Sequence, residues 1–219
     1  MAQRFRSVVL DVDSTLSAIE GIDWLAARRG EAMRAQVAEA TDRAMRGEIP
    51  VADVYGRRLD AVAPSREEVA ELGRAYVACA QPGARESLAK LTNSGVRVVL
   101  VTAALRDAVL PLARHLGLSD SDVNAVAVYF TPDGKYSGFD SNSPLCRNRG
   151  KAEVVRTLGL DKPVLGVGDG ITDLEIKTTE PPAVDAFAAY TGVIERPPVV
   201  RAADYVIRAF DELPAIVLG

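Results

Sequence analysis

Two aspartates separated by one residue follow an apolar segment near the start of the chain. Asp11 and Asp13 come directly after the run Val8–Leu10, which predicts a buried strand. Alternate side chains of an extended segment point the same way, so both carboxylates begin on one side of the backbone. They repel each other unless a cation or a shared proton compensates, and a hard ion such as Mg²⁺ prefers oxygen ligands. A strand end capped by Ser14 and Thr15 explains this segment alone equally well.

Later segments add polar groups at the ends of other predicted strands. Thr102 ends one apolar strand, and Asp169 follows another, with Asp173 four residues further on. Lys151 stands at the start of a helical pattern and adds a cation. Ligands of open α/β sheets bind beyond the carboxyl ends of the strands. We therefore expect these side chains to meet at one site.

Strand and helix patterns alternate over most of the chain, which predicts an α/β fold with a doubly wound, mainly parallel sheet. The segment 123–130 is expected to form a hairpin with 135–139 around the turn Asp133-Gly134. The predicted strands are 4–10, 96–101, 123–130, 135–139, 163–167, 183–187 and 204–207. The predicted helices of this part are 84–92, 105–116, 151–158, 172–178 and 210–217.

A long segment after the first strand carries helical patterns only. It is about sixty residues long, which is far more than a usual connection. Ser65 and Glu68 form a capping-box pattern at one helix start. We predict a small helical cap at residues 17–79, inserted into a core formed by residues 1–16 and 80–219. The predicted cap helices are 19–29, 31–46, 51–62 and 65–77.

Composition excludes several classes of protein. The chain has 219 residues and a formal net charge of −4, which argues against nucleic-acid binding. No apolar run approaches membrane-spanning length, and no signal peptide precedes the first strand, so we expect a cytoplasmic protein. Its only histidine, His115, and its two widely spaced cysteines, Cys79 and Cys146, match no metal or redox motif. A monomer and a homodimer both remain open.

The polar segments occur in an ordered set. Asp11-Val12-Asp13-Ser14-Thr15 comes first, Thr102 and Lys151 follow, and Gly168-Asp169-Gly170-Ile171-Thr172-Asp173 comes last. This set, with a helical insertion after the first motif, resembles the haloacid dehalogenase superfamily of phosphotransferases. Within it, the chain is similar to the phosphoserine phosphatase family. The resemblance covers almost the whole chain and implies a core of this superfamily's fold with a cap.

The resemblance also implies the roles of the central residues. Asp11 would be the nucleophile and form an aspartyl-phosphate, which divides hydrolysis into two easier steps. Asp13 would act as general acid and base. Asp11, Asp13 and Asp169 would hold Mg²⁺, while Asp173 would orient the water shell of the metal or Lys151. Lys151 would hold Asp11 and the phosphoryl oxygens together.

Residues of the predicted cap would recognise the substrate. The resemblance implies that Glu20 binds its amino group and Arg58 its carboxylate, although Arg57 is adjacent and fits the pattern as well. A carboxylate and an arginine fork suit the head of an amino acid, because arginine pairs with carboxylates in bidentate fashion. Solvated helix charges are the alternative explanation of Glu20 and Arg58. The other implied substrate contacts are Met45, Thr102, Ala103 and Thr172.

Some segments depart from the family's pattern. Ala103-Ala104 replaces two glycines, and alanine is disfavoured at positive φ. Either this loop has ordinary dihedrals, or phosphate and substrate sit differently. Arg147 and Arg149 replace small residues ahead of Lys151, and they would add positive charge at the mouth and favour a more anionic substrate. Tyr190-Thr191-Gly192 stands where the family often has a glycine-rich turn.

We expect a Mg²⁺-dependent phosphomonoester hydrolase that converts phosphoserine to serine and phosphate. One alternative is a phosphatase or phosphotransferase for another small phosphorylated acid, such as phosphohomoserine. A non-catalytic phosphate-binding regulatory protein on the same fold is a further alternative. It is disfavoured because a binding module would not need the four residues Asp11, Asp13, Lys151 and Asp169 together.

Overall fold

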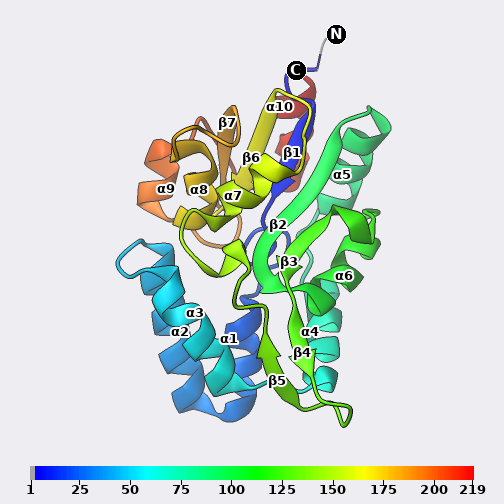
Figure 1. The fold of residues 1–219 in the computed structure, drawn as a ribbon. Coiled ribbons are helices and arrows are strands. Elements are labelled where there is room, and N and C mark those ends of the chain that lie inside the picture. The colour runs from blue at the N-terminus through cyan, green and yellow to red at the C-terminus, as the bar shows by residue number, and fades with distance from the viewer. Residues whose placement is uncertain (1–2) are drawn as a thin grey trace.

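A parallel six-stranded sheet forms the centre of the molecule. The computed structural model describes residues 3–219, and the strand order in the sheet is β3-β2-β1-β6-β7-β8, with every neighbouring pair parallel. Figure 1 shows the cap helices beyond one end of this sheet. The predicted mainly parallel sheet is confirmed. Its strands are β1 (Ser7–Leu10), β2 (Arg97–Leu105), β3 (Val123–Val126), β6 (Val164–Gly168), β7 (Ala186–Tyr190) and β8 (Tyr205–Ile207).

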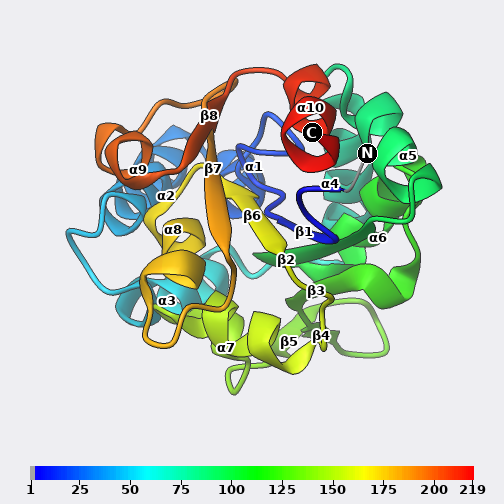
Figure 2. The same cartoon turned by 90° about the horizontal axis from the view of Figure 1, so that it is seen from above.

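Helices cover both faces of the sheet. In Figure 2, α5, α6 and α10 lie on one face, and α7 and α8 lie on the other. The central strands β1 and β6 are buried along their whole length, as expected for parallel strands that are covered on both faces. The core helices are α5 (Ala84–Asn93), α6 (Arg106–His115), α7 (Gly150–Thr157), α8 (Ile171–Thr178), α9 (Pro197–Ala202) and α10 (Leu213–Leu218). Short 3₁₀ turns occur at Ala27–Arg29, Asp120–Asp122, Pro144–Cys146 and Phe210–Glu212.

The segment between β1 and β2 is helical, as its sequence predicts. Its helices are α1 (Gly21–Ala26), α2 (Glu31–Met45), α3 (Val51–Val62) and α4 (Arg66–Ala78). The capping box is present, because Ser65 Oγ accepts from the Glu68 N–H at 3.2 Å and the Ser65 N–H donates to Glu68 Oε2 at 2.7 Å. Helix α4 packs closely on α6, where a Cβ at Gly73 would lie 3.2 Å from the carbonyl oxygen of Ala108. This helix therefore joins the cap to the core.

The predicted strand 123–130 is wrong as a single element. Its first half, β3, pairs with β2 in the main sheet, and its second half, β4 (Val128–Phe130), pairs antiparallel with β5 (Tyr136–Phe139). The predicted turn is present, with Gly134 at φ 83°. The hairpin supports α3 of the cap, since the Tyr136 hydroxyl donates to Asp60 Oδ1 at 2.7 Å. Two consecutive strands that join different sheets carry the same apolar pattern as one long strand, which explains the error.

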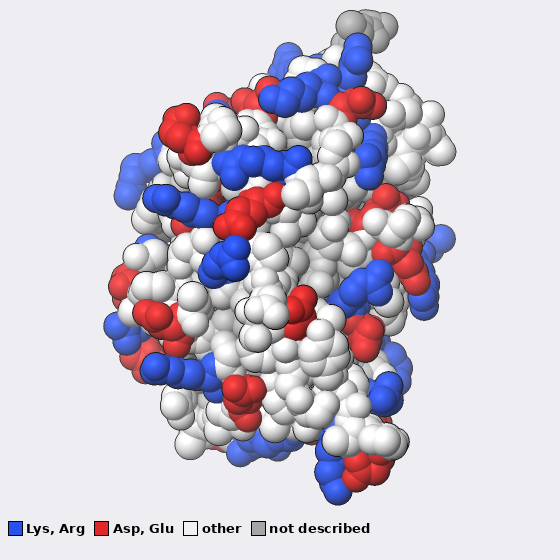
Figure 3. Space-filling view, viewed as in Figure 1, with Lys and Arg blue, Asp and Glu red and all other residues white. Residues whose placement is uncertain are grey.

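The surface carries mixed charge. On the face shown in Figure 3, lysine and arginine side chains alternate with aspartate and glutamate, without a large area of one sign. Among residues 3–219, none of the helices combines the length and the apolar character that crossing a bilayer requires.

Candidate active site

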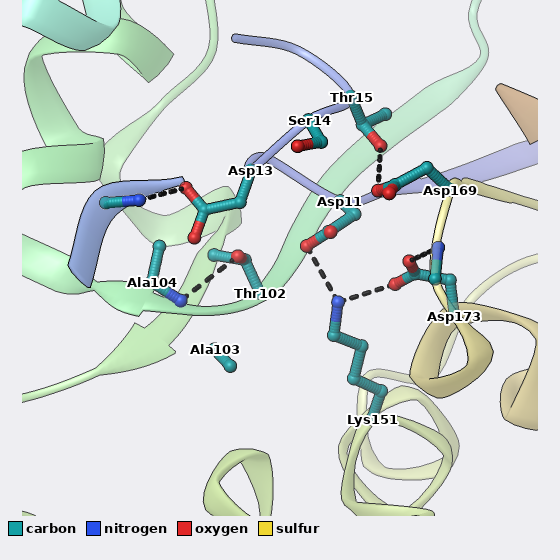
Figure 4. Close-up of polar contacts among 12 residues, drawn as sticks. Asp11, Asp13, Ser14, Thr15, Thr102, Ala103, Ala104, Lys151, Asp169 and Asp173 are labelled. Atoms are coloured by element: carbon teal, nitrogen blue, oxygen red, sulfur yellow. Dashed lines mark hydrogen bonds and ion pairs between the residues drawn. The ribbon is translucent and has the colours of Figure 1, made fainter. Parts of the chain in front are cut away.

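Three carboxylates meet at the carboxyl edge of the sheet (Figure 4). Asp11 follows β1 and its N–H donates to the carbonyl of Val167 in β6 at 3.1 Å, while Asp169 follows β6 and Asp173 lies in the first turn of α8. Their oxygens lie within 4.8 Å of one another, and all three residues are buried. An all-oxygen group of this kind suits a hard divalent ion. The pairing of neighbouring parallel strands is what brings Asp11 and Asp169 together.

Lys151 lies between two of these carboxylates. Its Nζ is 2.7 Å from Asp11 Oδ1 and 2.5 Å from Asp173 Oδ1. Burial lowers the pKa of Lys151, but the two carboxylates raise it by more, so its pKa lies above the ordinary value and the amine stays protonated. The preceding Gly150 allows this position, because a Cβ there would lie 1.6 Å from the carbonyl oxygen of Pro144.

One lysine does not compensate the negative charge of the cluster. Loss of hydration and the neighbouring charge of Asp173 hold the pKa of Asp169 well above its usual range. Burial and the charge of Asp11 raise the pKa of Asp173 to about 6, against the opposing effect of Lys151. Loss of hydration, and after it the neighbouring carboxylates, thus disfavour the ionised forms of Asp169 and Asp173. A divalent cation would relieve this repulsion, so the residues present fit a metal.

Asp13 lies outside this group of carboxylates. Its Oδ1 accepts from the Tyr76 hydroxyl at 2.5 Å and from the Gly21 N–H at 3.2 Å, and its carboxylate points toward the cap (Figure 4). Loss of hydration and the charge of Glu20 raise its pKa well above the ordinary value, against the Tyr76 hydrogen bond. The Asp13 side chain therefore faces the cap pocket, while Asp11, Asp169 and Asp173 form the carboxylate cluster.

The end of β2 settles the question of the two alanines. Neither Ala103 nor Ala104 has a positive φ, because β2 continues in extended conformation to Leu105. Thr102 is buried, and its Oγ1 accepts the Ala104 N–H at 3.2 Å. The Ala103 carbonyl accepts the Tyr55 hydroxyl at 2.7 Å. This segment therefore has ordinary backbone dihedrals, and the two alanines impose no backbone strain.

A cavity of about 50 Å³ lies between the strand ends and the cap. It is lined by all the predicted site residues except Asp173, which contacts Lys151 instead. The residues lining it are Asp11, Asp13, Glu20, Ile22, Asp23, Thr41, Met45, Tyr55, Arg58, Thr102, Ala103, Lys151, Asp169 and Thr172. Core and cap thus both contribute residues to one cavity.

Charged groups of the cap face this cavity. Glu20 Oε1 accepts the Ser14 hydroxyl at 2.6 Å, and loss of hydration raises the pKa of Glu20 to about 7, although the Ser14 bond opposes the shift. Arg58 is only 9% exposed and lines the cavity, whereas Arg57 is exposed and lies outside it. Of the two adjacent arginines, the structure places Arg58 at the site.

Two other departures from the family's pattern have no part in the cavity. Arg147 forms an ion pair with Glu153 at 2.7 Å, and neither Arg147 nor Arg149 lines the cavity. Neither arginine therefore belongs to the wall of the cavity, and their effect on the choice of substrate stays a prediction. Tyr190 is structural, since its hydroxyl donates to Gln81 Oε1 at 2.8 Å.

Sequence reasoning missed two residues that contact the site. Arg196 is 5% exposed, and its Nε lies 3.2 Å from Asp169 Oδ2 while its Nη1 lies 3.9 Å from Asp42 Oδ1 in the cap. Tyr76 holds Asp13 from α4. Both contacts join segments far apart in the chain, and no local motif marks either residue. Arg196 adds a second cation beside the carboxylates.

The parallel sheet, the inserted helices and the lysine among carboxylates define an α/β enzyme that acts on a small anionic molecule. The model of the haloacid dehalogenase-like hydrolases matches residues 8–176, and the chain belongs to this family. Over 210 residues it is 37% identical to phosphoserine phosphatase of Mus musculus, covering 94% of this chain and 91% of that protein.

Two further comparisons agree. The chloroplastic phosphoserine phosphatase of Arabidopsis thaliana is 36% identical over 94% of this chain and 70% of its own. The crystal structure of a phosphoserine phosphohydrolase-like protein from Francisella tularensis superposes with a TM-score of 0.85 at 25% identity, covering 97% of this chain and 100% of that one. The similarity thus extends over core and cap together.

Proposed function

We propose that this chain hydrolyses L-phosphoserine to L-serine and phosphate with Mg²⁺. One observation carries the proposal: a single cavity holds both the Asp11–Lys151 pair and, on the cap side, Glu20 and Arg58 with opposite charges. The first pair suits a phosphoryl group, and the second suits the zwitterionic head of an amino acid. The similarity to phosphoserine phosphatases along the whole chain supports the same substrate.

The metal is proposed from the donor set. Asp11 and Asp169 would hold Mg²⁺ together with Asp13, the third ligand that the sequence predicts, and Asp173 would orient Lys151. The ion supplies positive charge that offsets the repulsion between a phosphate dianion and the carboxylates. Arg196, through its contact with Asp169, contributes to the same balance of charge.

The proposed reaction has two steps. The Asp11 carboxylate attacks phosphorus, the bond from phosphorus to the serine oxygen breaks, and Asp13 gives its proton to that oxygen. Asp13 then takes a proton from water, the water oxygen attacks the aspartyl-phosphate, and phosphate leaves with Asp11 restored. Lys151 and the Thr102 hydroxyl hold the phosphoryl oxygens. Both hydrogen bonds to Asp13 from the described residues end on Oδ1, which leaves Oδ2 for this proton exchange.

Residues 17–79 act as the cap that recognises the substrate in this proposal. Glu20 binds the ammonium group and Arg58 the carboxylate, while Met45, Ala103 and Thr172 complete the wall of the cavity. The Arg58 fork gives the geometric selectivity, because a carboxylate accepts two of its N–H groups at once.

Phosphate release from a panel of phosphomonoesters tests the proposal. The panel contains L-phosphoserine, D-phosphoserine, phosphohomoserine, phosphoethanolamine and an aryl phosphate, each with Mg²⁺ and with EDTA. We expect turnover that requires the metal and strongly favours L-phosphoserine. Metal-dependent turnover with another preferred ester would overturn the substrate, and undiminished turnover in EDTA would overturn the metal site.

A further inference from the structure

Three side chains from three helices of the cap form a connected row at the wall of the cavity. Asp23 comes from α1, Thr41 from α2 and Arg58 from α3. The Thr41 hydroxyl donates to Asp23 Oδ1 at 2.7 Å and accepts an N–H from Nη1 of Arg58. All three residues line the cavity, and Thr41 is only 4% exposed. The hydroxyl is therefore the link between the two charges.

The direction of the hydroxyl proton follows from its two possible acceptors. Asp23 Oδ1 lies at 2.7 Å, and the carbonyl oxygen of Val37 lies at 3.0 Å. A hydroxyl has one proton, and a carboxylate is the stronger acceptor. The proton thus points to Asp23, and the oxygen lone pairs face the Arg58 N–H. Donor, hydroxyl and acceptor stand in series, so each hydrogen bond strengthens the other.

This arrangement leaves most of the guanidinium available. Among the described residues no direct ion pair joins Asp23 to Arg58, and Arg58 Nε is buried without a hydrogen-bond partner. A direct bidentate pair would occupy two N–H groups and cancel the charge. A single bond to Thr41 holds Nη1 in place and keeps the other donors for a ligand.

We propose that Thr41, supported by Asp23, is a positioning residue that orients Arg58 toward the carboxylate of the substrate. It thereby sets the preference of the enzyme for phosphorylated amino acids over phosphorylated amines. This inference rests on the proposed function, in which Arg58 binds the substrate carboxylate. Thr41 acts through Arg58 and has no part in the chemistry at Asp11.

The variant Thr41→Val tests this role, since it removes the hydroxyl and keeps the shape. Two substrates are compared: L-phosphoserine, and phosphoethanolamine, which has the same phosphate and ammonium groups but no carboxylate. We expect KM for L-phosphoserine to rise about tenfold or more, with kcat within about threefold of wild type. For phosphoethanolamine, kcat/KM stays within about threefold of wild type.

Two further variants serve as controls, and a third tests the support that Asp23 gives to Thr41. Thr41→Ser keeps the hydroxyl and restores KM for L-phosphoserine. Thr92→Val on α5 also removes a hydroxyl, which donates to the carbonyl oxygen of Leu88, four residues earlier, at 3.0 Å. This variant leaves KM and kcat for both substrates unchanged. Asp23→Asn keeps an acceptor oxygen without its charge, and it raises KM for L-phosphoserine in the same direction by a smaller factor. Urea unfolding curves check that every variant is folded.

Arg58→Ala, measured on both substrates, separates this inference from the proposed function. If Arg58→Ala removes the preference for L-phosphoserine but Thr41→Val keeps it, the link through Thr41 is wrong and the proposed function stands. Equal losses on both substrates in Thr41→Val also overturn the inference. If the wild type does not prefer L-phosphoserine to phosphoethanolamine, the proposed function and the role of Thr41 are both wrong. The double variant is expected to be no worse than Arg58→Ala alone, because both changes act on one contact.

Discussion

Charges at the end of the sheet touch one another directly, whereas Asp23 and Arg58, which line the cavity from the cap, are joined through a hydroxyl group. In the core, Lys151 Nζ lies within 2.7 Å of both Asp11 and Asp173. On the cap side of the cavity, the hydroxyl of Thr41 lies between Asp23 and Arg58 and hydrogen-bonds to both. Direct pairs fix the position of a reacting group and offset its charge. Charges joined through a hydroxyl are held in place while they keep their attraction for a ligand.

The difference assigns separate tasks to the two regions. Groups at the strand ends act on a phosphoryl group whatever ester carries it, so changes there should affect all substrates alike. Groups in the cap bind the part of the substrate that lies beyond the phosphate, so changes there should affect different substrates unequally. The variants that test activity are therefore measured on L-phosphoserine and on a second phosphate ester.

The largest effect is expected from Asp11→Asn. The change removes the proposed nucleophile with little change of volume, so phosphate release should fall by about 10³-fold or more on both esters. The matched control is Asp211→Asn, at an exposed aspartate outside the cavity, which should keep full activity. Near wild-type turnover by Asp11→Asn on either ester would refute the mechanism.

Lys151→Met is expected to lower both activity and stability. It leaves the buried carboxylates of Asp11 and Asp173 without their cation, which should cost about 3 kcal/mol in the free energy of unfolding without metal. Urea titration in EDTA measures this loss. Lys177→Met removes a lysine of an exposed ion pair with Asp204 and should cost about 1 kcal/mol or less. Equal stability of the two variants would show that Lys151 is not needed to compensate its neighbours.

Arg58→Ala should separate the two regions most clearly. Loss of a charged hydrogen-bonding partner should lower kcat/KM for L-phosphoserine about thirtyfold or more, while an aryl phosphate loses no more than about threefold. Arg57→Ala provides the control at an exposed neighbour and should leave both values unchanged. Losses of similar size on the two esters would assign Arg58 a structural role.

The smallest effect concerns pH. Because the pKa of Glu20 is raised to about 7, its carboxyl is mostly neutral at pH 6 and mostly ionised at pH 8. Only the ionised form attracts an ammonium group. The ratio of kcat/KM for L-phosphoserine to that for the same molecule without its amine should therefore rise about tenfold between these pH values. Glu20→Gln should make the ratio independent of pH, and a ratio that stays flat in the wild type would contradict the role.

Local patterns were sufficient for much of the fold. Apolar runs predicted β1 and β6, and helical periodicity with the Ser65 capping box predicted the cap helices. The strand 123–130 was wrong because alternation of apolar residues does not say which sheet a strand joins. Its division between β3 and β4 depends on contacts with β2 and with the cap, which lie far away in sequence.

Some residues of the site could likewise be predicted from local patterns, and others could not. Asp11, Asp169 and Lys151 were predictable because each stands at a strand end or helix start that a parallel sheet brings together. The direction of the Asp13 side chain was not, because Tyr76 from α4 decides it. Arg196 was missed for the same reason, since its contact with Asp169 follows from packing and not from spacing.

Direct detection of the phosphorylated enzyme tests the central claim, that the core performs one chemistry on Asp11. The wild-type protein is mixed with L-phosphoserine and Mg²⁺, quenched in acid within milliseconds, digested and examined by mass spectrometry. We predict a phosphoryl group on Asp11 that disappears with EDTA and in Asp11→Asn. Release of phosphate with no label on Asp11, or with label on another residue, would contradict the account.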